Sequence, residues 1–410
     1  MKRLRVGILF GGRSGEHEVS LLSAASIFKA IDRQKYDVVP IGITKEGRWL
    51  TELHAERLLK GEHPEPKPPA DASVASAGAK THHLRAGDPE ATPGAAVLQH
   101  GEAVLVPPVP VSSSGQSSII PFDTAEAATS AKPAIEVDVI FPVLHGTFGE
   151  DGTIQGLLDL AEIAYVGSGV LGSAAGMDKD VMKRLFRDAR LPMVRHVTIL
   201  RQQWEDEPKK TRKQIESALR YPLFVKPANL GSSVGISKAH DPGELAPAIE
   251  EAARYDRKIV IEQGVGGRKH KAREIECAVL GNDGPKASVC GEIIPVKEFY
   301  DYDAKYIDEG SKLLIPAKLT RAQQKQVQEM AVRGFQACDC CGLARVDFLM
   351  DPVSEKIYIN EVNTMPGFTS ISMYPKLWAA SGIAYPELID RLIQLGLERH
   401  QDRKRNRYVK

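Results

Sequence analysis

The stretch YINEVNTMPGFTSISMYP, residues 358–375, begins like a β-strand and then breaks at a Pro-Gly pair. Because side chains alternate faces along a strand, Glu361 and Asn363 project from the same face about 7 Å apart. A carboxylate and an amide therefore present their oxygen atoms to one point, immediately before the chain turns at Gly367.

A second strand pattern, LARVDFLMD, comes shortly before this stretch and places Arg345 and Asp347 on one face. Only a short turn separates the two strands, so they are predicted to form a β-hairpin that gathers Asp347, Glu361 and Asn363. Oxygen ligands without His or Cys suit Mg²⁺. The alternative is a set of solvent-facing polar residues, but the apolar neighbours Val346 and Val362 favour a strand with a buried face.

Composition sets limits on the remainder of the chain. The 410 residues are 42% hydrophobic, which predicts two or three globular domains. Lys plus Arg number 54 and Asp plus Glu number 53, so no bulk charge favours nucleic acid or a membrane surface. The N-terminal apolar run is too short for a membrane span, and the five cysteines are interpreted as thiols of a cytoplasmic protein rather than metal ligands.

The chain order indicates an α/β part followed by α+β parts. Residues 4–10 read as a strand that leads through a glycine turn into a helix at 21–31, which predicts a parallel sheet. Residues 62–134 are rich in Pro, Ala, Ser and Gly and are interpreted as a long surface insertion, with room for one hairpin at 95–111. A buried strand is expected again within 137–146.

The loop GSSVG at 231–235 lies between two predicted strands. Its small residues allow backbone N–H groups to approach a phosphate, and Lys226 lies on the preceding strand within reach of the same loop. The loop is neither a Walker A loop nor a dinucleotide fingerprint. By itself it is more typical of an ordinary Gly/Ser hairpin turn.

Seven motifs in order closely resemble the D-alanine–D-alanine ligase family of the ATP-grasp superfamily. They are FGGRSGEHEVSL, FPVLHGTFGEDGTIQG, GMDK, FVKPANLGSSVGISK, FYDYDAKY, LARVDFLM and NEVNTMPGFTSIS. The resemblance implies a three-domain ATP-grasp fold with ATP between the central and C-terminal domains. The expected boundaries are 1–170, 171–261 and 262–396, followed by a solvated basic tail at 397–410.

The resemblance also implies a reaction: one D-alanine carboxylate is phosphorylated by ATP, and the amine of a second D-alanine displaces phosphate from the acyl phosphate. Lysines and the glycine loop are expected at the phosphates, Glu262 and the backbone after it at adenine, and Glu274 at the ribose. The implied ATP-binding residues are Lys179, Lys226, Ser233, Glu262, Gln263, Val265 and Glu274. Two Mg²⁺ or Mn²⁺ ions are expected on Asp347, Glu361 and Asn363, with Glu361 bridging them.

Further residues resemble those that handle the amino acids. Glu16 resembles the carboxylate that holds the first D-alanine's ammonium, with His145 beside it. Arg345 and the N–H of Gly367 resemble the oxyanion stabilisers. Ser232, Tyr306 and Glu16 resemble a hydrogen-bonded triad. The second D-alanine is expected near Lys305, Ser372 and Met373.

Two features depart from the expected family pattern. The turn GVGGRKHKAREIEC at 264–277 is longer and more basic than usual, and the segment 62–134 exceeds the expected length. A D-alanine–D-lactate ligase remains the close alternative. A dinucleotide-binding oxidoreductase lacks its glycine fingerprint here, and a non-catalytic nucleotide-binding regulator would not need Asp347, Glu361, Asn363 and Arg345 together. The family suggests a homodimer.

Overall fold

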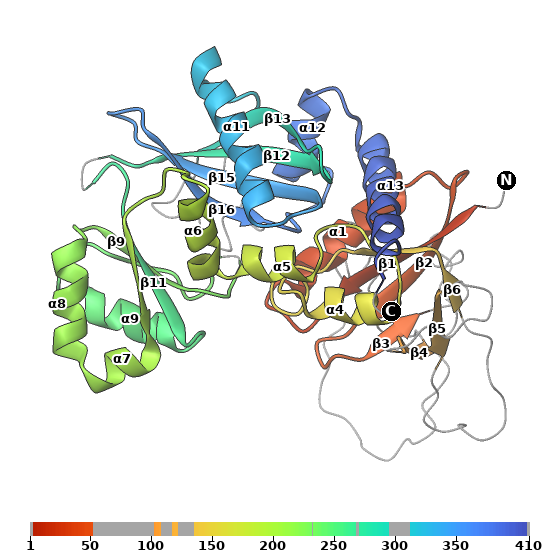
Figure 1. The fold of residues 1–410 in the computed structure, drawn as a ribbon, viewed down its shortest axis with the longest axis horizontal. Coiled ribbons are helices and arrows are strands. Elements are labelled where there is room, and N and C mark those ends of the chain that lie inside the picture. The colour runs from red at the N-terminus through yellow and green to blue at the C-terminus, as the bar shows by residue number, and fades with distance from the viewer. Residues whose placement is uncertain are drawn as a thin grey trace, which may run out of the picture.

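The computed structural model describes residues 3–51, 102–107, 117–121, 135–231, 233–267, 270–294 and 312–407, and three β-sheets organise them (Figure 1). The predicted mixture of an N-terminal α/β part with later α+β parts is confirmed by these sheets. None of the helices in the described part of the chain has the length and apolar character that a membrane span requires.

The N-terminal sheet has a parallel centre and an antiparallel extension. Strand β1 (Leu4–Gly11) pairs in parallel with β2 (Tyr36–Ile43) and with β7 (Val139–Pro142), as the sequence predicts. The last six residues of β1 are buried, because the sheet is covered on both faces. Helix α1 (His17–Ala30) packs beside β1, and α4 (Thr153–Leu160) follows β7.

The remaining strands of this sheet correct the interpretation of residues 62–134. Two of them lie within that segment and pair in the sheet, so these parts belong to the fold rather than to a surface insertion. Most of the predicted hairpin at 95–111 lies outside the described residues, and the described strand at 102–105 pairs with strands outside that range. The antiparallel extension consists of β3 (Trp49–Thr51), β4 (Glu102–Leu105), β5 (Ser117–Pro121) and β6 (Ile135–Val137).

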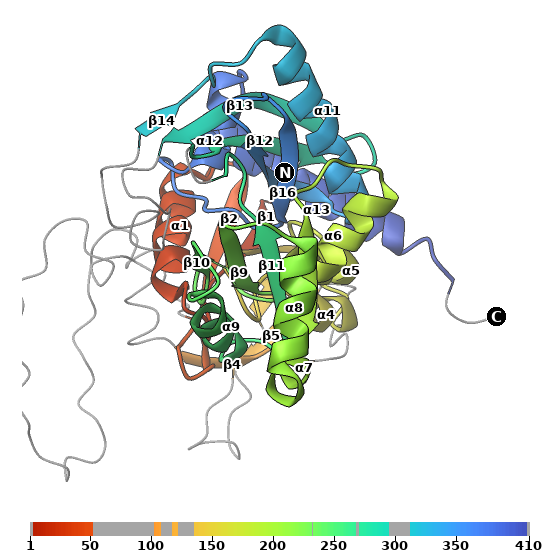
Figure 2. The same ribbon diagram turned by 90° about the vertical axis from the view of Figure 1, so that its left-hand side faces the viewer.

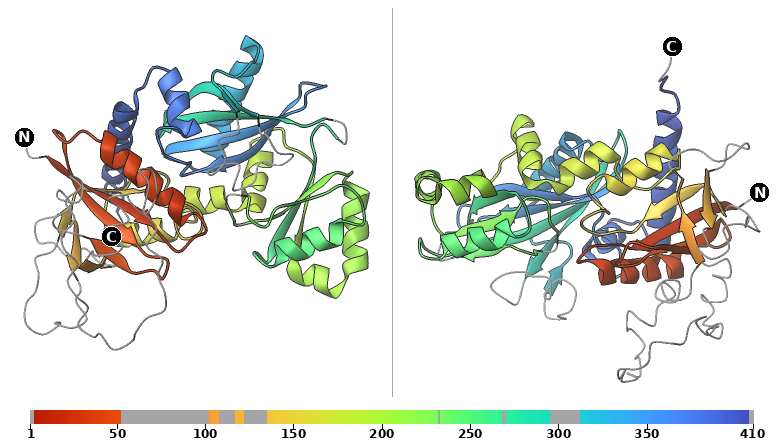
Figure 3. Two further views of the ribbon diagram at one scale, coloured as in Figure 1. Left: turned by 180° about the vertical axis from the view of Figure 1, so that it is seen from behind. Right: turned by 90° about the horizontal axis from the view of Figure 1, so that it is seen from below.

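A four-stranded antiparallel sheet forms the second unit. Its strands are β8 (His196–Leu200), β9 (Leu223–Pro227), β10 (Ser237–Ala239) and β11 (Lys258–Gln263), in the order β10-β9-β11-β8. Helices α7 (Arg201–Asp206), α8 (Pro208–Ala218) and α9 (Leu245–Ala253) complete it. Seen from behind, α8 and α9 cover the face that points away from the C-terminal sheet (Figure 3). The predicted hairpin around GSSVG is confirmed as β9 and β10.

The third sheet carries the stretch that opened the sequence analysis. Its strands are β12 (Arg273–Gly281), β13 (Lys286–Ile294), β14 (Lys312–Leu314), β15 (Gly342–Met350) and β16 (Ile357–Asn363), in the order β14-β13-β12-β15-β16. Helix α11 (Arg321–Ala337) begins with a capping box at Thr320 and packs against one face of the sheet (Figure 2).

Helices connect the three sheets. Helix α5 (Val170–Met177) and helix α6 (Lys179–Asp188) lead from the N-terminal sheet to the four-stranded sheet. Helix α12 (Met373–Ala380) and helix α13 (Tyr385–Arg403) follow the third sheet, and α13 returns to pack beside the N-terminal strands.

The C-terminal end corrects the predicted tail. Residues 397–403 continue α13, and the guanidinium of Arg399 lies 4.1 Å from the centre of the Tyr165 ring. Arg403 also forms an ion pair with Asp159 of α4. The basic residues at the start of the predicted tail therefore attach the last helix to the N-terminal region.

Candidate active site

The hairpin β15–β16 brings the predicted oxygen donors together. Arg345 lies opposite Asn363, and Asp347 lies opposite Glu361, so all four side chains share the face that the sequence predicts. A β-bulge follows Asp347, where the register shifts. The Asn363 amide donates to Asp347 Oδ2 over 2.9 Å. The prediction that this hairpin forms and gathers these residues is confirmed.

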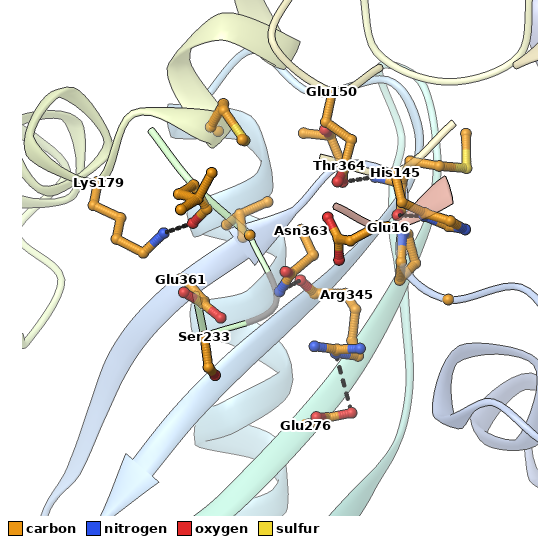
Figure 4. A pocket seen from close by; sticks show the side chains of 18 of the residues that line it. Glu16, His145, Glu150, Lys179, Ser233, Glu276, Arg345, Glu361, Asn363 and Thr364 are labelled. Atoms are coloured by element: carbon orange, nitrogen blue, oxygen red, sulfur yellow. Dashed lines mark hydrogen bonds and ion pairs between the residues drawn. The ribbon is translucent and has the colours of Figure 1, made fainter. Parts of the chain in front are cut away.

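A third carboxylate extends this arrangement onto the neighbouring strand. Glu276 of β12 lies opposite Asp347, so Glu276, Asp347 and Glu361 form a row across β12, β15 and β16. Arg345 donates to both Asp347 oxygens over 2.7 Å, and its Nε lies 3.1 Å from Glu276 Oε2 (Figure 4). Glu276 is not among the site residues predicted from the sequence, although strand alternation from Glu274 places both on one face.

The donor set suits a hard divalent cation. In the described ranges, no cluster of three or more His, Cys, Asp and Glu side chains is arranged to hold a metal ion. In the row of carboxylates, the guanidinium of Arg345 lies between Glu276 and Asp347. Asp347, Glu361 and the amide oxygen of Asn363 remain as oxygen donors on adjacent strands. Such a set fits Mg²⁺ when substrate phosphates supply the other ligands.

Two adjoining cavities meet at this row. They share Ser233, Ile236, Glu276, Arg345 and Glu361. The first cavity is further lined by Glu16, His145, Glu150, Lys179, Asn363, Gly367, Ser372 and Met373 (Figure 4). The second cavity is further lined by Phe224, Lys226, Glu262, Gln263, Val265, Glu274, Asp347 and Leu349. Among the described residues, those predicted for the amino acids line the first cavity, while those predicted for the nucleotide, apart from Lys179, line the second.

Two lysines surround one carboxylate at the wall of the second cavity. Glu262 Oε1 lies 2.8 Å from Lys183 Nζ, and Glu262 Oε2 lies 2.7 Å from Lys226 Nζ; all three side chains are buried. Burial would raise the pKa of Glu262, but the two ammonium groups hold it well below its usual range. Burial would likewise lower the pKa of Lys226, but the charge of Glu262 outweighs it and raises that pKa.

This cluster changes the interpretation of Glu262. Its carboxylate is engaged by lysines, so contact with a base would come from the backbone that follows it. The sequence analysis missed Lys183, which lies one helical turn after Lys179 on α6. The signal was a second lysine at i+4 on a helix with a strongly apolar face.

Lys179 forms a hydrogen bond with the backbone at the start of the glycine loop. Its Nζ donates to Leu230 O over 2.7 Å, at the base of the GSSVG turn. Ser233 and Gly235 have φ angles of 60° and 69°, the left-handed region. A Cβ atom at Gly231 would lie 2.7 Å from Glu16 Oε2, so a larger residue here would require the Glu16 side chain to shift. The loop therefore reaches the N-terminal region at the residue predicted to hold the first amino acid.

The connection after β11 is fixed by backbone and amide contacts. Gln263 Oε1 accepts from Arg220 N over 3.1 Å, and Gly264 N donates to Pro222 O over 2.8 Å. These contacts hold the segment that leads to Val265 along the edge of the second cavity. Glu274 lines the same cavity from β12.

N-terminal side chains hold the Pro-Gly segment of the opening stretch. Glu150 accepts from Met365 N over 3.0 Å and from Gly146 N over 2.7 Å. His145 Nδ1 lies 3.0 Å from Met365 O, and its Nε2 lies 3.1 Å from the Ser23 hydroxyl. A carbonyl can only accept, so Nδ1 carries a proton and His145 fixes the backbone at Met365.

The pKa values of the two side chains that hold this segment are strongly shifted. Burial lowers the pKa of His145, consistent with its neutral form. Burial together with the charge of Glu16 raises the pKa of Glu150 to about 8. Glu150 lies within a motif that the sequence analysis quoted but did not assign, because a Glu before Asp-Gly reads locally as an ordinary turn residue.

The residues after the Pro-Gly break form hydrogen bonds with one another. The Ser372 hydroxyl lies 2.7 Å from the Thr369 hydroxyl and accepts from Thr369 N over 3.1 Å. A Cβ atom at Gly367 would lie 3.2 Å from Ser372 Oγ, so the turn is closely packed. Met373 is buried at the start of α12 and lines the first cavity with one edge.

Comparisons with known proteins agree with this geometry. The family model described as "D-ala D-ala ligase N-terminus" matches residues 5–168, and "D-ala D-ala ligase C-terminus" matches residues 185–394. The chain belongs to the D-alanine–D-alanine ligase family.

Individual relatives match over nearly the whole length. D-alanine–D-alanine ligase of Heliobacterium modesticaldum is 47% identical over 407 residues, which cover 99% of this chain and 98% of that protein. D-alanine–D-alanine ligase A of Escherichia coli is 46% identical over 401 residues, 98% and 97% of the two chains. The expectation that the segment 62–134 is longer than is usual in the family stays a prediction.

Solved structures of the family share the fold. The D-alanine–D-alanine ligase from Coxiella burnetii superposes with a TM-score of 0.74 at 31% identity, covering 99% of this chain and 97% of that one. The D-Ala:D-Ser ligase VanG from Enterococcus faecalis superposes with a TM-score of 0.76 at 34% identity, covering 96% and 100%.

Three residues that the family resemblance singles out, Ser232, Lys305 and Tyr306, lie outside the described residues. The domain boundaries at 170, 261 and 396 stay predictions, and β11 runs past the second of them to Gln263.

Proposed function

We propose that this D-alanine–D-alanine ligase family member joins two D-alanine molecules to D-alanyl-D-alanine, with ATP converted to ADP and phosphate, in the synthesis of a peptidoglycan precursor. The observation that carries the proposal is the meeting of two cavities at Arg345 and Glu361. A nucleotide in one cavity and an amino acid in the other would bring the γ-phosphate to the carboxylate that it must activate.

The second cavity supports ATP binding. Phe224 and Leu349 supply apolar surface for a base, and the backbone from Gln263 to Val265 supplies hydrogen-bonding groups beside them. Glu274 is the candidate for the ribose hydroxyls. Lys226 and the loop at Ser233 lie at the end that adjoins the first cavity, where the phosphates would be held.

The first cavity supports two amino acids. Glu16 is buried and supplies a carboxylate for the ammonium of the first D-alanine. Arg345 and the N–H of Gly367 are the candidate donors to the oxyanion that forms when the second amine attacks. His145 and Glu150 hold the backbone on the N-terminal side of Gly367, so they fix the direction of that donor. Ser372 and Met373 are candidates for the second amino acid's subsite.

Asp347, Glu361 and Asn363 would hold divalent ions, with Mg²⁺ or Mn²⁺ as candidates. When bound, such ions supply positive charge that offsets the phosphate oxygens during transfer. We further infer a homodimer working in the cytoplasm, where ATP is available. Sedimentation of the purified protein would test the oligomeric state.

The reaction is tested by phosphate release from ATP with D-alanine, L-alanine and D-lactate, offered singly and in pairs. We expect release that requires D-alanine and a divalent metal, with D-alanyl-D-alanine as the product. Abundant D-alanyl-D-lactate would instead favour the alternative ligase.

The site is tested by Glu361→Gln, which removes one metal-binding charge at the junction of the cavities. Turnover should fall by far more than tenfold, the equivalent of about 1.4 kcal/mol in activation free energy. Glu355→Gln is the matched control, since Glu355 lies exposed in the turn of the same hairpin, and it should keep wild-type turnover. Turnover of the Glu361 variant above a tenth of wild type would contradict the assignment.

A further inference from the structure

Glu276 occupies a position where a strand of this sheet would ordinarily carry an apolar side chain. It is only 5% exposed, and it lies on the face of β12 that continues into the core through Ala278 and Leu280. A buried carboxylate is costly unless a positive group pairs with it. The positive group here is Arg345, whose Nε lies 3.1 Å from Glu276 Oε2.

Arg345 is held by two carboxylates that have different tasks. Asp347 accepts hydrogen bonds of 2.7 Å from Nε and Nη2 of Arg345. Glu276 contacts the same guanidinium from the adjacent strand. Asp347 is also a candidate metal ligand. A divalent cation draws on the same carboxylate oxygens that now accept from Arg345, and it repels the guanidinium. The Asp347 contact with Arg345 would therefore weaken if a divalent ion bound at Asp347.

Glu276 does not belong to the proposed ligand set. Its carboxylate lines both cavities and lies beside the Arg345 guanidinium, as the close view shows (Figure 4). We propose that Glu276 is a positioning residue: it holds the Arg345 guanidinium at the junction of the two cavities while Asp347 serves the metal ions. The inference rests on the proposed function, because it needs Arg345 to act on the reacting groups.

The test uses the full-length enzyme and the variant Glu276→Gln, which keeps the shape and removes the charge. We expect kcat to fall about 10- to 100-fold, while the KM values for ATP and D-alanine change less than about threefold, because an interaction with the reacting group is lost rather than uniform binding. Glu276→Asp, which keeps the charge, should recover at least about a quarter of the wild-type kcat.

A double-mutant cycle identifies the route of the effect. If Glu276 acts through Arg345, adding Glu276→Gln to Arg345→Lys should change kcat less than about twofold, because lysine has already lost the planar fork. Losses that multiply in the double variant would overturn the proposal. A wild-type kcat in Glu276→Gln, or an increase in the KM for ATP alone, would overturn it as well.

Glu292→Gln is the matched control. Glu292 is a buried carboxylate on β13 of the same sheet, held by both arms of Arg273 over 2.8 Å, and it belongs to the opposite face because it lies across from Ile275. Its kcat should stay within about twofold of wild type. An equal fall in both variants would mean that any buried pair in this sheet matters, and would overturn the specific role.

The two proposals fail in different ways. A wild-type protein that forms no D-alanyl-D-alanine contradicts the proposed function and, with it, this inference. An active wild type with an unimpaired Glu276→Gln contradicts the inference alone.

Discussion

The N-terminal and C-terminal sheets share one core, whereas the four-stranded sheet has a core of its own. Residues of β1 and α1, such as Phe10 and Phe28, belong to the same buried cluster as Phe368 and Leu392 from the other end of the chain. We call this cluster the shared core. The buried cluster of the four-stranded sheet contains only residues from 199 to 261, and we call residues 196–263 the central unit.

The difference separates two kinds of attachment. Apolar burial is contiguous across the shared core, so the two ends of the chain should unfold together. The contacts that join the central unit to the rest include the buried ion pair of Lys183 on α6 with Glu262 on β11. The second cavity lies where these two regions face each other, between residues of β9 and β11 and residues of β12 and β15. We expect the central unit to have a separate, lower local stability.

The largest effect should follow from Phe368→Ala. Phe368 is fully buried, and its ring lies 5.6 Å from the rings of both Phe141 and Tyr385. Its removal should cost about 3–5 kcal/mol in unfolding free energy. Amide hydrogen exchange should rise in β1 and α13 together and stay unchanged in β9 and β11.

The neighbouring Ile371→Ala is the control for this variant, because Ile371 is 72% exposed, and it should leave exchange unchanged. Faster exchange confined to the C-terminal helices would mean that the two sheets do not share one cooperative core.

A smaller and more local effect is expected from Ile249→Ala. Ile249 is fully buried in α9 among the residues of the central unit. The cavity left by the smaller side chain should lower the unfolding free energy of the central unit by about 2–5 kcal/mol. Amide hydrogen exchange should then be faster in β8, β9 and β11 alone. Glu250→Ala, exposed on the same helix, should change stability by less than about 0.5 kcal/mol. Simultaneous loosening of β1 would contradict the independence of the central unit.

The buried contact of His145 with the Met365 backbone should make the free energy of unfolding depend on pH. Burial lowers the pKa of the folded imidazole, whereas an unfolded histidine titrates near 6.5. The unfolded state therefore binds the extra proton, and wild-type protein loses stability as the pH falls below about 6.5. The destabilisation caused by His145→Gln should shrink by up to about 2 kcal/mol between pH 7.5 and pH 5, measured by denaturant unfolding.

The titration of Glu150 should not obscure the pH measurement. Glu150 also contacts the Met365 backbone, and its pKa is raised to about 8. Because Glu150 is present in both the wild type and the variant, its contribution to the pH dependence of stability cancels to first order. A penalty for His145→Gln that is equal at both pH values would show that the folded histidine is protonated as readily as the unfolded one.

The smallest effect is expected from shortening residues 65–95. Their composition is rich in Pro, Ala and Gly and offers little apolar surface to either core. Turnover should stay within about twofold of wild type, measured by phosphate release. Loss of activity in a soluble, folded variant would assign the segment a contact with the N-terminal sheet or with a second copy.

Local patterns were sufficient for the elements that carry the site. Alternation along β15 and β16 placed Asp347, Glu361 and Asn363 on one face, because the period of a strand is fixed by its backbone. A strand followed by a glycine turn and a helix predicted the parallel start at β1, and a Gly/Ser loop between two strand patterns predicted the hairpin around GSSVG. The ordered motifs added the family, which the comparisons confirm.

Only the tertiary structure decided which distant segments meet. No local period indicates that Glu276 lies opposite Asp347, that Lys183 reaches Glu262, or that Glu150 accepts from Met365 N. These contacts join residues far apart in the chain, and they depend on the order of strands and on the closing of cores. The sequence by itself determined the strands, the loop and the chemistry of the hairpin. The packing of α13 against the N-terminal strands decided that the two ends share a core, because apolar faces commit to a partner only when the whole chain is folded.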